Sequence, residues 1–158
     1  MKDKTNSAIH VFCIITLVLC ILWAVFETFV FLGLLTGWGG VSEKANWSGD
    51  VSLKIVFLVI YFCSTVVLIR MCLKVIINTL KGVREHVTFP QSNVKPLFWL
   101  AAASFVYMLC WVNQPILHKD GFVIRFAGTN FILPFLLLFF AFMYKVAADA
   151  VEENSLTV

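Results

Sequence analysis

Charged residues are scarce in this sequence. Lys, Arg, Asp and Glu together make up 13% of the 158 residues, against about 25% in ordinary soluble domains. Hydrophobic residues make up 61% of the chain, and 16 of them are Phe. So little polar surface cannot cover a water-soluble globule of this size. The composition therefore excludes a soluble fold and indicates a membrane protein.

The residue sets that carry most enzyme and metal chemistry are also missing. The sequence has no Walker loop, GxGxxG or CxxC motif and no Ser-His-acid set. Its three histidines, His10, His86 and His118, are scattered over three regions and cannot form a metal site. The net charge is +3 without a basic run, which disfavours nucleic acid as a ligand. We therefore predict a protein that is not an enzyme, needs no cofactor or metal and does not bind nucleic acid directly.

What the sequence does contain is four long apolar runs, at about residues 8–35, 51–77, 94–112 and 131–148. About 20 helical residues cross 30 Å of hydrocarbon, and open strands cannot satisfy their backbone in lipid. The first run contains Trp23 and Glu27 and lacks an A-x-A site, so we expect a span rather than a signal peptide. The sequence thus predicts a single all-α membrane domain, an antiparallel bundle of four transmembrane helices.

The basic residues predict how the chain crosses the membrane. An N-terminus on the inside puts eight basic residues near the cytoplasmic ends of the spans and four near the outer ends. The positive-inside rule favours this orientation. We therefore expect a multi-pass protein of the plasma (cytoplasmic) membrane with both termini in the cytoplasm. The inner set is Lys2, Lys4, Arg70, Lys74, Lys81, Arg84, Lys95 and Lys145, and the outer set is Lys44, Lys54, Lys119 and Arg125.

The second outer loop carries a hairpin signal. Between residues 116 and 126 an Asp-Gly dipeptide separates two apolar or alternating runs, which is typical of a tight turn between two strands. We predict a short extracellular β-hairpin in which Phe122, Ile124 and Phe126 share one face. The alternative is a loop that lies along the membrane surface.

Glu27 is the unexpected residue of the first span, because it lies about 7 Å outward of the span's midpoint by the helical rise. A carboxylate at that depth is costly and usually faces a bundle interior. We predict an intramembrane polar site in which Glu27 is paired with Lys54, Asn113 or Gln114, with Arg125 as a further candidate. The alternative interpretation is a proton or ligand site.

Polar residues also continue the second helix beyond the membrane. Arg70 and Lys74 begin a polar stripe at helical spacing that predicts an amphipathic extension of the helix. Their side chains either reach lipid phosphates or bind an anionic partner. Pro90 breaks the helix, and Ser92 or Asn93 is expected to cap the third one.

Two segments on the predicted cytoplasmic side resemble a known family. Residues 82–97, GVREHVTFPQSNVKPL, resemble a "G…F…NV..L" pattern, and the tail 148–158, ADAVEENSLTV, resembles an ending "L..EN.LTV". With four spans in about 160 residues, the chain resembles bacterial membrane proteins of the domain-of-unknown-function family 2975. The resemblance implies no catalytic activity. Many members are encoded beside a very small helix-turn-helix DNA-binding protein, which implies a regulator as partner.

These segments define a candidate cytoplasmic interaction site of Arg70, Lys74, Phe89, Asn93, Glu153 and Leu156. We also predict that the tail from Glu152 pairs with the loop near Phe89 in a short strand-like contact, because Leu156 and Val158 are apolar.

The leading function is a regulatory or signalling membrane protein whose partners are membrane lipids and a small DNA-binding regulator. The rivals are a small proton-coupled exporter, suggested by Glu27 in the first of four spans, and a structural or lipid-binding membrane protein. The sequence predicts neither a ligand nor an oligomeric state.

Overall fold

The computed structural model describes residues 2–38, 44–85, 87, 89–118, 124–126 and 128–156. These residues form four long helices: α1 (Lys2–Thr36), α2 (Val51–Arg84), α3 (Val94–Asn113) and α4 (Ile132–Leu156). All four are long and apolar enough to cross a membrane. For the described residues, the prediction of an all-helical chain with four helices capable of spanning a membrane is therefore confirmed.

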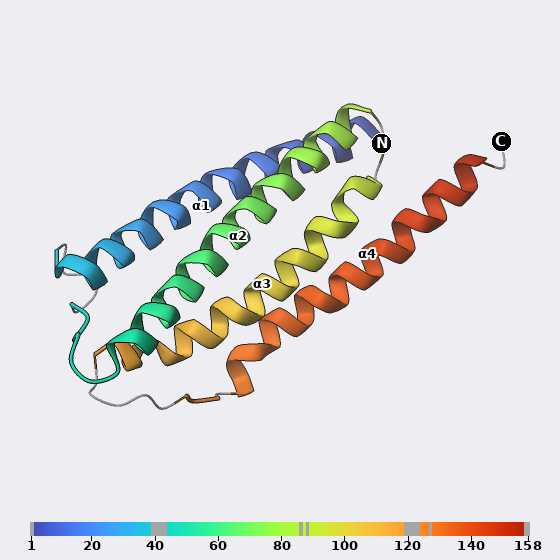
Figure 1. Ribbon diagram of the computed structural model, residues 1–158. Helices are drawn as coiled ribbons and strands as arrows, with labels where there is room; N and C mark the ends of the chain where they lie inside the picture. Colours follow the sequence, from blue (N-terminus) through green and yellow to red (C-terminus); the bar gives the residue numbers. More distant parts are fainter. Residues whose placement is uncertain are drawn as a thin grey trace.

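The helices follow one another in space as they do in the chain. α1 packs on α2, α2 on α3 and α3 on α4, in keeping with the tendency of consecutive elements to be neighbours in space. Figure 1 shows both termini at the same end of the molecule as the α2–α3 loop. We call this the terminal end. The opposite end holds the α1–α2 and α3–α4 loops.

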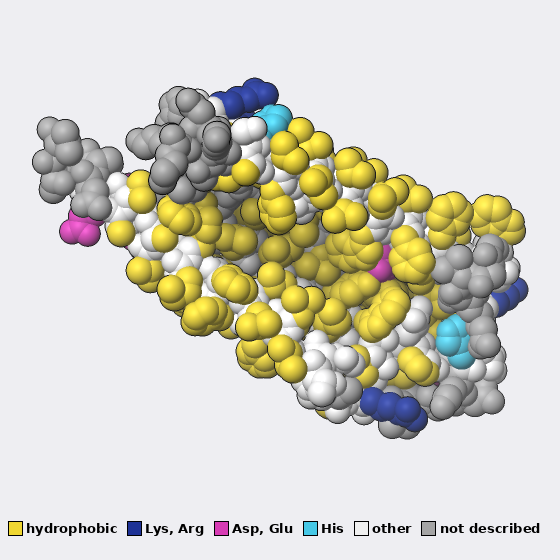
Figure 2. All heavy atoms as spheres, turned by 180° about the vertical axis from the view of Figure 1, so that it is seen from behind, with side chains coloured by type: hydrophobic (Ala, Val, Ile, Leu, Met, Phe, Trp, Pro, Cys, Tyr) yellow, Lys and Arg dark blue, Asp and Glu magenta, His cyan; other side chains and the backbone are white. Residues whose placement is uncertain are grey.

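The surface of this fold is apolar, as a lipid-facing surface requires. Large side chains such as Phe12, Leu22, Phe139 and Val146 are more than half exposed. Figure 2 shows one face covered by hydrophobic side chains along its length, with Lys and Arg toward its ends. The small buried core instead gathers around Leu34, Tyr61, Leu68 and Tyr107, where α1, α2 and α3 meet.

The predicted β-hairpin is not supported, since the described residues contain no strand. Ile116 belongs to a short 3₁₀ helix, η2 (Gln114–Leu117), and residues 124–126 have no regular structure. The Asp-Gly dipeptide and Phe122 lie outside the described residues. The reason for the difference is that the backbone of Arg125 bonds the side chain of Asn113, and the carbonyl of Leu117 accepts from the N–H of Asn46. These contacts take the place of a strand partner.

The predicted strand-like tail is also wrong for the residues that the structure describes. α4 continues as a helix through Leu156, so its last turns carry Glu152 and Glu153 on a helix rather than on an extended segment. Residues 157 and 158 lie outside the described range. Phe89 contacts Tyr144 of α4 instead, with ring centroids 5.5 Å apart. The tail stays helical because each residue added to the end of α4 forms one further backbone hydrogen bond.

Candidate functional site

The carboxylate of Glu27 lies at the meeting point of three helices. Its side chain is 2% exposed. Oε1 accepts from the Trp23 indole N–H at 3.1 Å and from the Tyr107 hydroxyl at 2.5 Å. Oε2 accepts from the Tyr61 hydroxyl at 3.3 Å. We call Trp23, Glu27, Tyr61 and Tyr107 the carboxylate cluster.

Helical spacing and aromatic packing build this cluster. Trp23 precedes Glu27 by four residues, so the two side chains share one face of α1. The rings of Tyr61 and Tyr107 are 5.6 Å apart, and the Trp23 ring meets Tyr107 edge-on at 5.7 Å. Buried tyrosines need a partner for the hydroxyl. The Glu27 carboxylate therefore accepts hydrogen bonds from three donors that would otherwise lack a partner in apolar surroundings.

The structure does not pair Glu27 with Lys54. The Lys54 side chain is 1% exposed, and its Nζ donates to the carbonyls of Asn46 and Ser48 at 2.6 and 2.9 Å. Lys54 lies near the start of α2, seven residues before Tyr61, which is about 10 Å along a helix. Its ammonium fixes the α1–α2 loop at the opposite end.

Asn113 and Gln114 also lie toward the opposite end rather than at Glu27. The Asn113 amide donates to the carbonyls of Leu109 and Arg125 at 2.8 and 2.9 Å. Gln114 begins η2, and the Arg125 side chain is exposed. The predicted polar site is therefore two separate features. Its carboxylate lies one to two turns deeper in the membrane than its expected partners.

Glu27 lies in neutral surroundings. Within the described ranges, no Lys, Arg or His nitrogen lies within 4.0 Å of its carboxylate. The side chain also borders a groove of about 420 Å³ between α1 and α2, lined mainly by apolar residues such as Phe31, Leu58 and Phe62. The site thus combines a buried carboxylate with an adjoining apolar groove between α1 and α2.

A second polar cluster lies at the terminal end. Asn93 is fully buried, and its Nδ2 contacts Thr79 Oγ1 at 3.0 Å and Tyr144 Oη at 3.3 Å. The Tyr144 hydroxyl is also 3.2 Å from the Pro90 carbonyl, and Gln91 donates to Asp149 at 2.8 Å. We call Thr79, Pro90, Asn93 and Tyr144 the terminal cluster. It joins α2, the α2–α3 loop and α4.

The terminal cluster changes the expected role of Asn93. Asn93 occupies the N-cap position of α3, yet its side chain makes no capping hydrogen bond. Its Oδ1 is buried without a partner in the part of the chain that the structure describes. Tertiary contacts with Thr79 and Tyr144 have replaced the local cap.

The six residues of the predicted cytoplasmic site fall into three groups. Phe89 and Asn93 lie at the terminal cluster. Arg70 and Lys74 are exposed on the surface of α2 and line a shallow groove there. Glu153 is exposed on the last turns of α4, and Leu156 ends that helix. The loop and α4 therefore meet through Tyr144 and Asp149 rather than through the residues from Glu152 onward.

Sequence reasoning missed the partners of Glu27. Tyr61 and Tyr107 read as ordinary apolar positions, although they are two of only three tyrosines in the chain. Tyrosine is enriched at membrane interfaces. A tyrosine well inside a span therefore indicates a polar partner for its hydroxyl. Trp23 at the i−4 position of Glu27 is a second signal of such a partner.

Within the described residues, the fold and these clusters define a protein with four helices capable of spanning a membrane, a buried carboxylate and a loop fastened to its last helix. No group of three His, Cys, Asp or Glu that could hold a metal is present within the described ranges. No protein-family model, curated protein or solved structure matches the chain.

Proposed function

We propose that the protein is a non-catalytic regulatory membrane protein of bacterial domain-of-unknown-function family 2975. In this proposal both termini lie in the cytoplasm, the membrane is the plasma membrane, and the partner is a small helix-turn-helix DNA-binding protein. The observation that supports it is the contact between the α2–α3 loop and α4. The two segments that resemble the family belong to the structures that meet there.

The terminal cluster gives a soluble partner an ordered surface. Gln91 bonds Asp149 and Phe89 packs on Tyr144, so these two loop side chains are already held in place before a partner binds. Preorganised loops lose less conformational entropy on binding than flexible ones. The basic residues Lys81, Arg84 and Lys95 lie toward the same end, in keeping with a cytoplasmic orientation.

Photo-crosslinking in cells tests this function. A benzophenone amino acid at Phe89 or Val151, both partly exposed, should give an adduct whose partner is a small helix-turn-helix protein by mass spectrometry. The matched control is Trp38, which is exposed at the opposite end, where no such adduct is expected. The proposal fails if the two terminal-end positions give no helix-turn-helix adduct, or if Trp38 gives the same one.

A second candidate function is a small proton-coupled exporter. The observation that favours it is Glu27, because the carboxylate lies inside the membrane, borders a groove and has no cation within 4.0 Å in the described ranges. Ionisable residues in such positions often mark proton or substrate pathways.

Dye efflux tests the exporter. Proteoliposomes with an imposed proton gradient should move a lipophilic cationic dye, and Glu27→Gln should abolish that movement. Glu153→Gln is the control, because this exposed carboxylate lies on the last turns of α4. Absence of gradient-driven movement by the unmodified protein would exclude this candidate.

A further inference from the structure

Two basic side chains lie on the exposed surface of α2, within the part of the helix that we expect to lie in the membrane. Arg70 and Lys74 are both exposed, and with Val66, Ile69, Leu73 and Ile77 they line a shallow groove of about 510 Å³. All six residues belong to α2. The groove is therefore a stripe on the surface of one helix, with two cations among aliphatic side chains.

The depth of these cations follows from the start of α3. Thr79 contacts Asn93 at the beginning of α3, and α3 has only 20 residues, about 30 Å or one hydrocarbon thickness. Lys74 and Arg70 precede Thr79 by five and nine residues. They therefore lie about 7 and 13 Å inside the level at which α3 begins.

Among the side chains that the structure describes, no acidic one neutralises this pair. Lys145 pairs with Asp149 at 4.0 Å, whereas neither Arg70 nor Lys74 has a described carboxylate within that distance. A cation inside the hydrocarbon layer is costly unless an anion or water reaches it. The nearest anions are the lipid headgroups at the terminal end, and long basic side chains can extend from this depth toward them.

We propose that Arg70 and Lys74 form a binding site for an anionic phospholipid. Its phosphodiester lies between the guanidinium and the ammonium, one helical turn apart on the same face, and one acyl chain lies along Val66, Ile69 and Leu73. Arg suits a phosphate because its planar fork donates two parallel hydrogen bonds. A zwitterionic lipid brings its own cation to the site. An anionic lipid neutralises more of the positive charge of Arg70 and Lys74 than a zwitterionic lipid does, so it binds more tightly.

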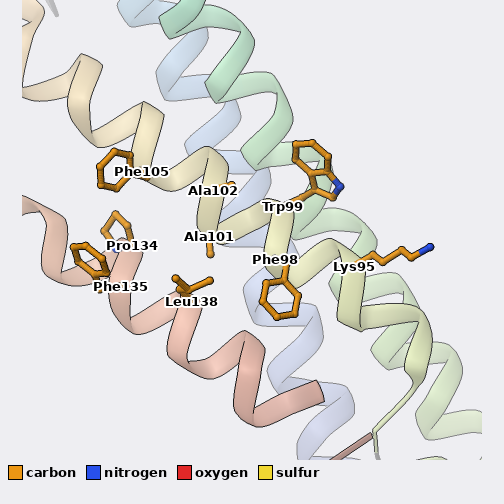
Figure 3. Close-up of a pocket in the computed structure, with 9 residues that line it drawn as sticks. All are labelled: Lys95, Phe98, Trp99, Ala101, Ala102, Phe105, Pro134, Phe135 and Leu138. Atoms are coloured by element: carbon orange, nitrogen blue, oxygen red, sulfur yellow. The ribbon is translucent and has the colours of Figure 1, made fainter. Parts of the chain in front are cut away.

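The larger groove between α3 and α4 lacks this charge pattern. It has a volume of about 620 Å³ and is lined by Phe98, Phe105, Pro134 and Leu138, with one basic residue, Lys95. Figure 3 shows Phe98 pointing toward α4, whereas the Lys95 side chain points away from α4. This groove suits an acyl chain without selecting a headgroup. Lys95 therefore provides a matched control.

Native mass spectrometry of the full chain in detergent tests the site. Phosphatidylglycerol should bind more tightly than phosphatidylcholine. Arg70→Gln combined with Lys74→Gln should weaken phosphatidylglycerol binding about 30-fold, given the usual attraction of basic residues to anionic leaflets. Lys95→Gln should change it about threefold or less. Inorganic phosphate should not displace the lipid, because the aliphatic stripe holds the acyl chain.

A charge-preserving variant separates loss of the site from loss of the fold. Arg70→Lys combined with Lys74→Arg keeps both charges and should retain the preference for phosphatidylglycerol. The proposal is wrong if the unmodified protein binds both lipids equally, or if Lys95→Gln weakens binding as much as the double variant. Displacement by inorganic phosphate would also overturn it and indicate a site for soluble phosphate.

Discussion

Glu27 shows how a carboxylate is held in a membrane without an ion pair. Trp23, Tyr61 and Tyr107 each direct an N–H or O–H at its two oxygens. Each donor is itself largely buried, so donors and acceptor satisfy one another. The consequence is that replacing Glu27 affects three helices at once.

We expect Glu27→Leu to destabilise the protein more than Glu27→Gln. The amide keeps an acceptor oxygen, whereas Leu leaves an indole N–H and two hydroxyls unsatisfied, at about 1–3 kcal/mol for each stranded buried group. Tyr107→Phe removes the shortest bond of the cluster and should cost about 1 kcal/mol, in the range found for membrane hydrogen bonds. Thermal unfolding in detergent measures all three. Equal stability of the Leu and Gln variants would contradict this account of the cluster.

Gly82 is required by a close approach within the α2–α3 connection. A Cβ at this position would lie 2.7 Å from Pro90 Cγ and 2.8 Å from the Val87 carbonyl oxygen. The N–H of Val87 also donates to the Gly82 carbonyl at 2.8 Å. The last turn of α2 is thus in backbone contact with the loop.

We expect Gly82→Ala to destabilise the protein by about 1–3 kcal/mol, as overpacking does. The matched control is Gly128→Ala, where a Cβ meets nothing within 4 Å, and where a change within about 0.5 kcal/mol is expected. Thermal unfolding in the same detergent compares the stability of both variants with that of the unmodified protein. If the two alanines behave alike, the loop does not pack on Gly82 as described.

At the scale of elements, two thiols report how α1 packs on α2. The Cys20 and Cys72 side chains interact across this interface, and Cys20 is 7% exposed. A disulfide requires close Cβ atoms, so the pair is a sensitive probe of helix register.

Copper–phenanthroline oxidation should therefore join Cys20 to Cys72 within one chain. Peptide mass spectrometry after proteolysis identifies the bridge. The control is Cys63, which is exposed on α2 and should form no intramolecular bridge. A dominant bridge from Cys20 to another cysteine would mean a different α1–α2 register.

The sequence predicted those elements whose signal is local and strong. Runs of about 20 apolar residues leave the chain no alternative to helices in lipid, and the stripe from Arg70 predicted the extension of α2, which ends at Arg84. The Asp-Gly dipeptide of the α3–α4 loop predicted a β-hairpin that the structure does not support. The Asn113 side chain bonds the backbone of Arg125 instead.

The partners of Glu27 and the contacts of Asn93 depend on which helix faces meet. Tyr107 is 80 residues from Glu27 in the sequence, and Tyr144 is 51 residues from Asn93. Spacing along one helix cannot predict such contacts. Lys54 and Asn113 are related to Glu27 only by approximate depth in their spans, which determines a contact less well than the packing of aromatic side chains does.

For the whole molecule, orientation is the property on which the functional proposal depends. We expect cysteines introduced at positions 44 and 119 to react with an impermeant maleimide in intact cells. Those introduced at positions 4, 86 and 155 should react only after permeabilisation, because the basic residues favour the cytoplasm for the terminal end. Labelling of position 86 from outside would reverse the orientation.

The short α3 has a consequence for the bilayer itself. With 20 residues it is 14 residues shorter than α2, and its first and last turns are fastened by Asn93 and Asn113. α2 can accommodate a thicker membrane by tilting less, whereas α3 with its flanking 3₁₀ turns, Gln91–Leu117, has 27 residues and less length to spare. We therefore expect the protein to match best a hydrocarbon layer of about 30 Å, the length of α3 itself. In thicker, sterol-like bilayers the membrane must thin locally around α3, which favours clustering of molecules and exclusion from the thickest regions.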